Sequence, residues 1–306
     1  MSSVPNLPPR GAPSGRAVGF GLAVLGAIAF SGKAILAKLM YGHGVDALMV
    51  LMLRMLFALP IFVLIAWWAS RGQAALSARQ WAGVLFLGFI GYYLSSLLDF
   101  VGLQYITASL ERLILYLSPT LVVVMSWVLY RKPILPRQWL AMATSYAGVL
   151  LVFGREVGQQ GADVVLGAAL IMGSAASYAC YLLASARLVH VLGSLRLVGL
   201  ASTVACVLCI LHFLLLRPVE AAFAVAPAVI WLSLINATVC TVFPILFLMM
   251  AIERIGPGAS AQAGMIGPLS TILLGAVLLG EPFTVWVGLG TILVLVGVWM
   301  FSQARA

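Results

Sequence analysis

Ten long apolar runs, separated by short connections, constrain the fold of this sequence more than any other feature. A helix needs about 20 apolar residues to cross about 30 Å of hydrocarbon at about 1.5 Å per residue. The runs cover residues 17–40, 46–69, 80–102, 107–130, 136–154, 164–187, 195–216, 228–251, 257–280 and 284–302. Because 63% of the residues are apolar and only 8% are charged, a water-soluble fold could not bury this much hydrocarbon surface. The sequence therefore predicts an all-α integral membrane protein with ten transmembrane helices.

The positive charges predict how these helices are oriented. Cytoplasmic loops of membrane proteins carry an excess of Lys and Arg. If the N-terminus is inside, the outer loops hold only Arg155 and Arg217. The inner loops and ends then hold Arg10, Arg16, Arg71, Arg79, Arg131, Lys132, Arg137, Arg187, Arg196, Arg254 and Arg305. We therefore expect both termini to be cytoplasmic in a cell inner membrane, with residues 1–16 forming a cytoplasmic N-terminal tail.

The two halves of the chain align with each other. Leu117-Ser-Pro119 in the fourth run matches Ile266-Gly-Pro268 in the ninth, and Lys132-Pro133 after the fourth run matches Glu281-Pro282 after the ninth. Each half contains five predicted crossings, an odd number, so the second half enters the membrane in the opposite orientation. Many secondary transporters use inverted repeats of this kind to build two gates around one site at the membrane midplane.

The aligned segments also resemble a known family. The segment Gly267-Pro268-Leu-Ser-Thr-Ile-Leu-Leu-Gly-Ala-Val-Leu-Leu-Gly280-Glu281-Pro282 resembles the closing part of an EamA repeat of the drug/metabolite transporter superfamily. Ser109-Leu-Glu-Arg-Leu-Ile-Leu-Tyr-Leu-Ser-Pro119 resembles the matching part of an earlier repeat. The resemblance implies two EamA repeats, residues 17–154 and 164–302, around a central cavity. Similar family members export amino acids, related metabolites or drugs, so it also implies a secondary exporter of small polar metabolites.

Ionisable groups inside the apolar runs are the first candidates for a binding site. A charge at the bilayer centre costs at least a few kcal/mol unless it faces a cavity or a partner. Helical spacing places Tyr92, Ser96 and Asp99 on neighbouring positions of one helix face, and Tyr178 and Tyr181 extend a polar face of the sixth run. The full set of candidate substrate-binding residues is Lys33, Arg54, Tyr92, Ser96, Asp99, Glu111, Arg112, Tyr116, Tyr178, Tyr181, Asn236 and Gln262.

Two interpretations of these charges remain open at this point. In the functional one, a surplus of cations attracts a substrate carboxylate, while Asp99 or Glu111 contacts an amine or carries a coupling proton. In the structural one, Asp99 pairs with Arg112, and Glu111 pairs with Lys33 or Arg54, so that the charges only join helices. Proton coupling, facilitated diffusion, and a monomer or homodimer all stay open.

Other function classes fit the sequence less well. The three histidines are far apart without acidic neighbours at ligand spacing, so we expect no enzyme activity, metal or cofactor. Nucleic acid is not an expected partner, because the basic residues lie between apolar runs; the expected partners are a small-molecule substrate, the lipid bilayer and, for a proton-coupled carrier, protons. The alternatives are a drug, nucleobase or organic-acid exporter of the same fold, and a membrane assembly protein without transport activity.

Overall fold

The computed structural model describes residues 13–131 and 133–303. Most of the expected N-terminal tail, residues 1–12, and Lys132 lie outside these described residues. The first helix, α1, begins at Pro13. Residues 13–16, which the sequence assigned to the tail, are therefore the first turn of this helix.

Within the described residues, all regular secondary structure is helical. The α-helices are α1 (Pro13–Tyr41), α2 (Ala47–Ser70), α3 (Ala78–Leu87), α4 (Ser95–Gly102), α5 (Ala108–Leu115), α6 (Ser118–Tyr130), α7 (Pro136–Gln160), α8 (Asp163–Leu192), α9 (Ser194–Leu216), α10 (Pro227–Ala237), α11 (Phe243–Ala263), α12 (Ile266–Leu278) and α13 (Val285–Gln303). Two π-helical segments, η1 (Gly88–Leu94) and η3 (Thr238–Val242), continue their neighbouring α-helices, and a 3₁₀ turn, η2 (Val219–Ala222), precedes α10.

Eight helical stretches in the described chain are long and apolar enough to cross a membrane. They correspond to the first eight predicted runs. The ninth and tenth runs contain the shorter apolar helices Ile266–Leu278 and Val285–Phe301. The ninth run is shorter than expected because the chain kinks at Gly256, which has φ +80°, and turns again at Gly264 and Met265.

The fourth and ninth runs are interrupted at matching places. A turn at Tyr116 and Leu117 separates α5 from α6, just before Pro119, and a turn at Gly264 and Met265 precedes α12 and Pro268. Proline removes a backbone donor and clashes with the preceding turn, which explains why each helix is interrupted there. The π-helical segments η1 and η3 also occupy matching positions in the third and eighth runs, so the two halves share their irregularities as well as their helices.

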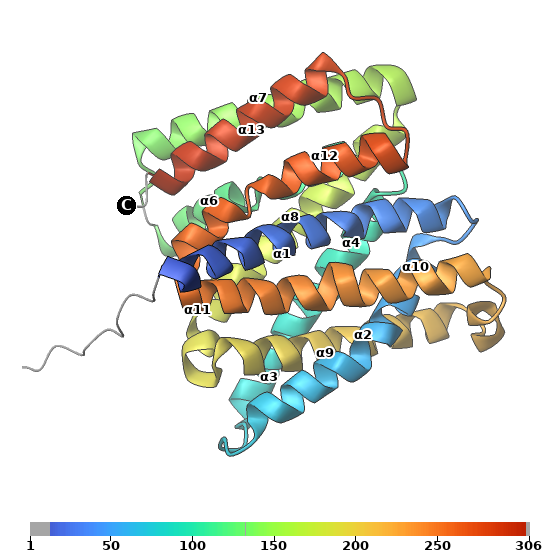
Figure 1. The fold of residues 1–306 in the computed structure, drawn as a ribbon, viewed down its shortest axis with the longest axis vertical. Helices are drawn as coiled ribbons and strands as arrows, with labels where there is room; N and C mark the ends of the chain where they lie inside the picture. The colour runs from blue at the N-terminus through green and yellow to red at the C-terminus, as the bar shows by residue number, and fades with distance from the viewer. Residues whose placement is uncertain (1–12, 132, 304–306) are drawn as a thin grey trace, which may run out of the picture.

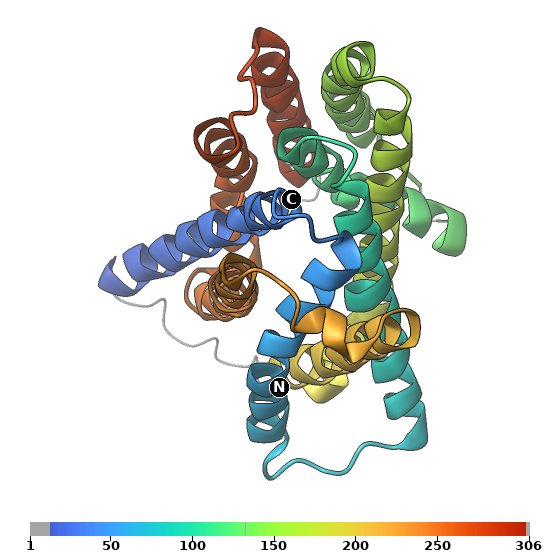
Figure 2. The same cartoon turned by 90° about the vertical axis from the view of Figure 1, so that its right-hand side faces the viewer.

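Helix packing follows the same internal symmetry (Figures 1 and 2). Helix α1, the first of the N-terminal half, packs against α11 and α12 of the other half. Helix α8, the first of the C-terminal half, packs against α4 and α6. Helices α2 and α9 pack together, as do α7 and α13. Each half therefore completes the other, and the core between them contains side chains from both.

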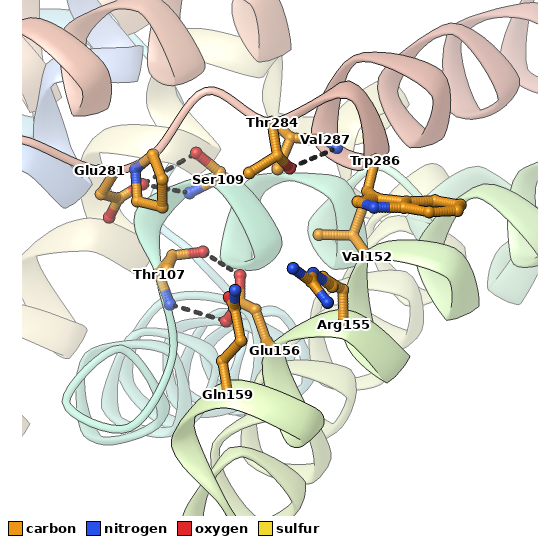
Figure 3. Close-up of a pocket in the computed structure, with 11 residues that line it drawn as sticks. Thr107, Ser109, Val152, Arg155, Glu156, Gln159, Glu281, Thr284, Trp286 and Val287 are labelled. Carbon is orange, nitrogen blue, oxygen red and sulfur yellow. Dashed lines mark hydrogen bonds between the residues drawn. The ribbon is translucent and has the colours of Figure 1, made fainter.

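The two ends of the bundle differ in charge. At one end Tyr41 donates to the carbonyl of Phe100, and a carboxylate oxygen of Glu281 accepts from Ser109 Oγ at 2.8 Å (Figure 3). Glu156 lies beside Glu281 in the same view. We call this the acidic end, defined by Asp46, Glu156 and Glu281. Helix α1 runs toward it, whereas α8 begins at it, so the two halves run in opposite directions.

The opposite end, which we call the basic end, is defined by Arg71, Arg131 and Arg196. There the Nη2 atom of Arg196 donates to the carbonyl of Ala74 at 2.9 Å. Helix α1 begins and α13 ends at this end of the bundle (Figure 1). This charge difference agrees with the distribution of the loop cations along the sequence, and the cytoplasmic location of the basic end stays a prediction.

Helices α7 and α13 approach each other closely through glycines. A Cβ atom at Gly148 would lie 2.6 Å from the carbonyl oxygen of Gly290, and one at Gly290 would lie 2.7 Å from the carbonyl oxygen of Gly148. Small residues allow such backbone contact, and dispersion forces across it stabilise helix pairs in lipid.

We expect Gly148→Leu to destabilise the protein by about 1–3 kcal/mol, because the new side chain meets backbone that cannot move aside. The measurement is thermal or denaturant unfolding of the purified protein in detergent. Gly154→Leu is the matched control, since a Cβ at Gly154 on the same helix meets nothing within 4 Å. Equal losses in both variants would contradict the packing argument.

Candidate functional site

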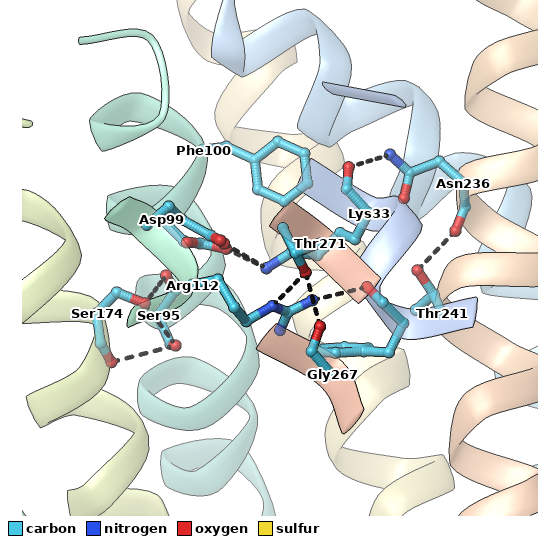
Figure 4. A network of polar contacts seen from close by, with 12 residues as sticks. Lys33, Ser95, Asp99, Phe100, Arg112, Ser174, Asn236, Thr241, Gly267 and Thr271 are labelled. Atoms are coloured by element: carbon cyan, nitrogen blue, oxygen red, sulfur yellow. Dashed lines mark hydrogen bonds and ion pairs between the residues drawn. The ribbon is translucent and has the colours of Figure 1, made fainter. Parts of the chain in front are cut away.

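A buried cluster of charges lies where the two halves meet (Figure 4). Lys33 of α1 forms ion pairs with Asp99 of α4 and with Glu111 of α5, and the Nζ to Oε1 distance to Glu111 is 3.5 Å. The exposed fractions of these three residues are 5%, 3% and 0%. One ammonium group is thus shared by two carboxylates inside the part of the protein that lipid surrounds.

Two arginines complete what we call the ionic cluster: Lys33, Arg54, Asp99, Glu111 and Arg112. Arg54 Nε donates to Thr241 Oγ1 at 2.9 Å, and Arg112 Nε donates to Thr271 Oγ1 at 2.8 Å. Both arginines are at least 95% buried, with exposed fractions of 5% and 3%. Three cations and two anions leave one formal positive charge in the cluster.

The pairings expected from the sequence are only partly correct. The Glu111–Lys33 pair is present. No ion pair joins Asp99 to Arg112, or Glu111 to Arg54, among the described residues; each arginine instead donates to a threonine of the C-terminal half. The reason is that Lys33 lies between the two carboxylates and occupies the position that an arginine would need.

Aromatic rings support all three cations. The Arg54 guanidinium lies 5.0 Å from the ring centre of Phe100, and the Arg112 guanidinium lies 5.1 Å from that of Phe30. Lys33 Nζ lies 5.3 Å from Phe30 and 5.6 Å from Phe100. Such cation–π contacts are strongest where water is excluded, so Phe30 and Phe100 partly offset the cost of burying the charges.

The C-terminal half contributes neutral polar groups, as the sequence suggested. Asn236 is fully buried, and its Nδ2 donates to the carbonyl of Lys33 at 3.2 Å. Thr241 donates to the carbonyl of Asn236 at 2.8 Å, at the π-helical segment η3. The irregular backbone of η3 therefore brings both side chains to the ionic cluster.

Several buried polar atoms of this region have no hydrogen-bond partner in the described structure. They are Arg54 Nη1, Asp99 Oδ1, both carboxylate oxygens of Glu111, and Asn236 Oδ1. Buried polar groups are nearly always satisfied in folded proteins, and each exception needs an explanation. Here both donors and acceptors are left over around one point, which is the arrangement that a polar ligand with groups of both signs would satisfy.

The predicted central cavity stays a prediction, because the charged side chains are packed against one another in this conformation. The tyrosines of the candidate list lie in a second group: the hydroxyls of Tyr92 and Tyr181 are 3.0 Å apart, and the rings of Tyr178 and Tyr181 stack at 5.6 Å. Tyr181 is buried, whereas Tyr178 is 39% exposed.

Ser96 is half-buried, and Gln262 is exposed. The neighbouring Ser95 forms a hydrogen bond to the other half: its Oγ atom lies 3.1 Å from Ser174 Oγ. Gln262 lies between the kink at Gly256 and the turn at Gly264, near the end of α11.

Tyr116 satisfies the interrupted backbone of the ninth run. Its hydroxyl donates to the carbonyl of Gly264 at 2.7 Å, and Ser31 Oγ donates to the carbonyl of Gly267 at 2.9 Å. Hydroxyl groups of the N-terminal half thus supply hydrogen-bond donors to carbonyl groups of the C-terminal half. Tyr116 thus fixes the helix break beside the cluster.

Phe30, Phe100 and Thr271 were not identified from the sequence. Two phenylalanines among many apolar residues carry no distinguishing signal. Thr271 could have been found, since it follows Pro268 by three residues on one helix face and so points to the same side as the helix break.

The comparisons with known proteins agree with this architecture. A family model described as the EamA-like transporter family matches residues 17–154 and again residues 165–303. The chain belongs to the EamA-like transporter family. It is accordingly a multi-pass membrane protein that transports small molecules across a lipid bilayer.

Similar proteins include two from Bacillus subtilis (strain 168). The uncharacterized transporter YcbK is 30% identical over 263 residues, covering 84% of each chain. The uncharacterized transporter YetK is 24% identical over 237 residues, covering 76% of this EamA-like chain and 71% of its own. A solved structure described only as "Crystal structure of protein" has a TM-score of 0.63 at 20% identity, over 96% of this chain and 98% of the other; it supports the fold alone.

We expect Lys33→Met to cost about 3–5 kcal/mol of stability, because it leaves two buried carboxylates without their cation. Unfolding of the detergent-purified protein measures the loss. Combining Lys33→Met with Asp99→Asn is expected to cost less than the sum of the single changes, because the pair is coupled. Arg217→Met is the control: the Arg217–Asp46 pair is exposed, so its loss costs about 0–1 kcal/mol. Additive effects at Lys33 and Asp99 would contradict the shared-ammonium geometry.

Proposed function

We propose that this EamA-like transporter is a secondary carrier that exports small polar metabolites, such as amino acids, across the cytoplasmic membrane by alternating access. The ionic cluster is its substrate site. We further propose that the chain is a carrier rather than an enzyme and works without a cofactor, and that its acidic end is outside.

The unpartnered atoms of the ionic cluster carry this proposal. Arg54 retains one buried donor, Nη1, which suits a substrate carboxylate. Asp99 Oδ1 and Glu111 Oε2 are acceptors without a partner, which suit an ammonium group; Glu111 Oε1 already lies 3.5 Å from Lys33 Nζ. A molecule with a carboxylate and an amine would satisfy both kinds of atom at once, and the net positive charge of the cluster favours an added carboxylate.

An exporter of drugs, nucleobases or organic acids is the alternative within transport. An organic acid would use Arg54 but would leave the acceptors of Asp99 and Glu111 unsatisfied. An uncharged drug would use neither. The arrangement therefore supports an amino acid more than these classes, and it supports a carrier more than an assembly protein, for which buried unpaired groups would bring only cost.

A counterflow screen in proteoliposomes tests the function directly. Vesicles containing the purified protein are preloaded with one compound, and uptake of the same labelled compound is followed for amino acids, purines, organic acids and cationic drugs. We expect saturable counterflow for an amino acid. A channel would give flux without saturation, and flux restricted to purines or drugs would reject the amino-acid assignment.

We expect Arg54→Gln to weaken the binding of carboxylate-bearing substrates selectively, by about tenfold or more in apparent affinity, because it removes a charge-assisted hydrogen bond. The same assay with the decarboxylated amine of the substrate is expected to change little. Arg196→Gln, which removes a buried arginine at the basic end, is the control. Equal losses for the acid and the amine would indicate a structural role for Arg54.

If a carboxylate of the cluster carries a coupling proton, Glu111→Gln is expected to abolish transport driven by a pH gradient while counterflow persists. The reason is that exchange of bound substrate needs no net proton movement. Asp99→Asn is measured in parallel, and Glu253→Gln, an exposed carboxylate, is the control. Unchanged pH-driven flux in both cluster variants would show that neither carboxylate carries the coupling proton.

A further inference from the structure

The first turn of α5 is held at the acidic end by two carboxylates from different helices (Figure 3). Glu281 lies in the connection between α12 and α13, in the second EamA match, whereas Glu156 lies on α7 of the N-terminal half, two residues beyond the end of the first match. A helix N-terminus carries free N–H groups and a partial positive charge, so carboxylates bind it favourably. The two carboxylates therefore fix the same turn, one from each repeat.

Glu281 contacts this turn through both of its oxygens. Oε1 accepts from the backbone N–H of Ala108 at 2.7 Å, and Oε2 accepts from Ser109 Oγ at 2.8 Å and from the N–H of Ser109 at 3.3 Å. A Cβ at Gly275 would lie 2.9 Å from Oε2, so the glycine makes room for the carboxylate. These three hydrogen bonds join the second repeat to the first.

Glu156 binds the same turn from within its own repeat. It accepts a hydrogen bond from Thr107 Oγ1 and another from the backbone N–H of Thr107 at 3.3 Å. Thr107 in turn caps the helix by accepting from the N–H of Leu110. Glu156 and α5 therefore belong to the same half of the chain, whereas Glu281 belongs to the other half.

Helix α5 connects this contact to the ionic cluster. It has only eight residues, and it carries Glu111 and Arg112 three and four positions after Ala108. The hollow beside the contact, lined by Arg155, Gln159 and Trp286 among others, has a volume of about 30 Å³, which is about the space of one water molecule. The hydrogen bonds of Glu281 thus join the two halves beside this hollow.

We propose that Glu281 is the latch of the outer gate: its hydrogen bonds to the first turn of α5 hold the acidic end closed and break when the carrier opens outward. The inference rests on the proposed transport function and adds to it the residue that controls access. Because α5 carries part of the ionic cluster, release of its first turn also changes the position of Glu111 and Arg112.

The internal repeat makes the two gates chemically unlike. In the sequence alignment of the halves, Lys132-Pro133 stands where Glu281-Pro282 stands. A lysine side chain has no acceptor for a backbone N–H, so the aligned position of the first half does not carry a residue that could make the same contacts.

Pulsed electron paramagnetic resonance tests the latch without any substrate. Spin labels are attached at Gln104→Cys, exposed in the connection before α5, and at Phe283→Cys, 68% exposed beside Glu281. The full-length protein is reconstituted in nanodiscs, with Cys180, Cys206, Cys209 and Cys240 replaced by alanine. Glu281→Gln preserves the shape of the side chain but replaces one carboxylate oxygen with an NH₂ group, which cannot accept a hydrogen bond from the N–H groups of α5.

We expect one short distance between the two spin labels in the parent protein. In the Glu281→Gln protein, we expect the fraction of molecules with a longer distance to rise by about tenfold, because charge-assisted hydrogen bonds are lost. Glu156→Gln, which alters the same helix turn within one repeat, is expected to keep the parent distribution. An unchanged distribution in Glu281→Gln, or an equal change in Glu156→Gln, would overturn the proposal.

Hydrogen exchange gives a second measurement that does not depend on the labels. The amides of Ala108 and Ser109 are expected to exchange about tenfold faster in Glu281→Gln than in the parent protein, because their acceptor is lost. Unchanged exchange would also overturn the latch. Neither measurement needs a transport assay. A failed counterflow screen together with a positive latch result would reject the substrate assignment alone. A successful screen together with a negative latch result would reject the latch alone.

Discussion

The shared ammonium group of Lys33 is the interaction on which the rest of this structure depends. In lipid, a buried charge without a partner is too costly to keep, and the chain has two carboxylates and three cations at one point. Lys33 joins α1 to α4 and α5, while Arg54 and Arg112 reach threonines of the other repeat. All five charges belong to the N-terminal half, and the threonines of the C-terminal half accept hydrogen bonds from its two arginines, so burial of the cluster depends on both halves.

Backbone hydrogen bonding imposes a second constraint near the same point. Helix breaks expose carbonyl groups that lipid cannot satisfy. Hydroxyl groups supply the missing donors: Tyr116 and Ser31 bind the ninth run, and Ser177 Oγ donates to the carbonyl of Ile90 in the π-helical segment η1 at 2.6 Å. These two irregular segments are thus satisfied by donors of the opposite half, whereas Thr241 donates within its own half at η3.

The sequence predicted the fold class and the residues of the ionic cluster because both depend on free-energy costs that can be recognised from the order of residues alone. A long apolar run has few stable structures other than a membrane helix. A charge inside such a run is costly unless it faces a partner or a cavity. The sequence predicted the Glu111–Lys33 pair but not the Asp99–Lys33 pair. The face that Asp99 presents depends on the π-helical segment before it, and that of Arg112 depends on the turn at Tyr116. Helical counting assumes a regular period and fails at such points. Glu281 was assigned to a loop whose charge merely matched its side of the membrane, since no local pattern shows that it reaches α5.

The π-helical segment η1 determines more than the local hydrogen bonds. A π turn contains more residues than an α turn, and one residue corresponds to about 100° of rotation in an α-helix. Loss of one residue from Gly88–Leu94 would keep the span long enough for the bilayer yet turn Asp99 away from Lys33. Single-residue insertions and deletions here offer evolution a route to new chemical selectivity, with the scaffold intact and no substitution at the contacting side chains.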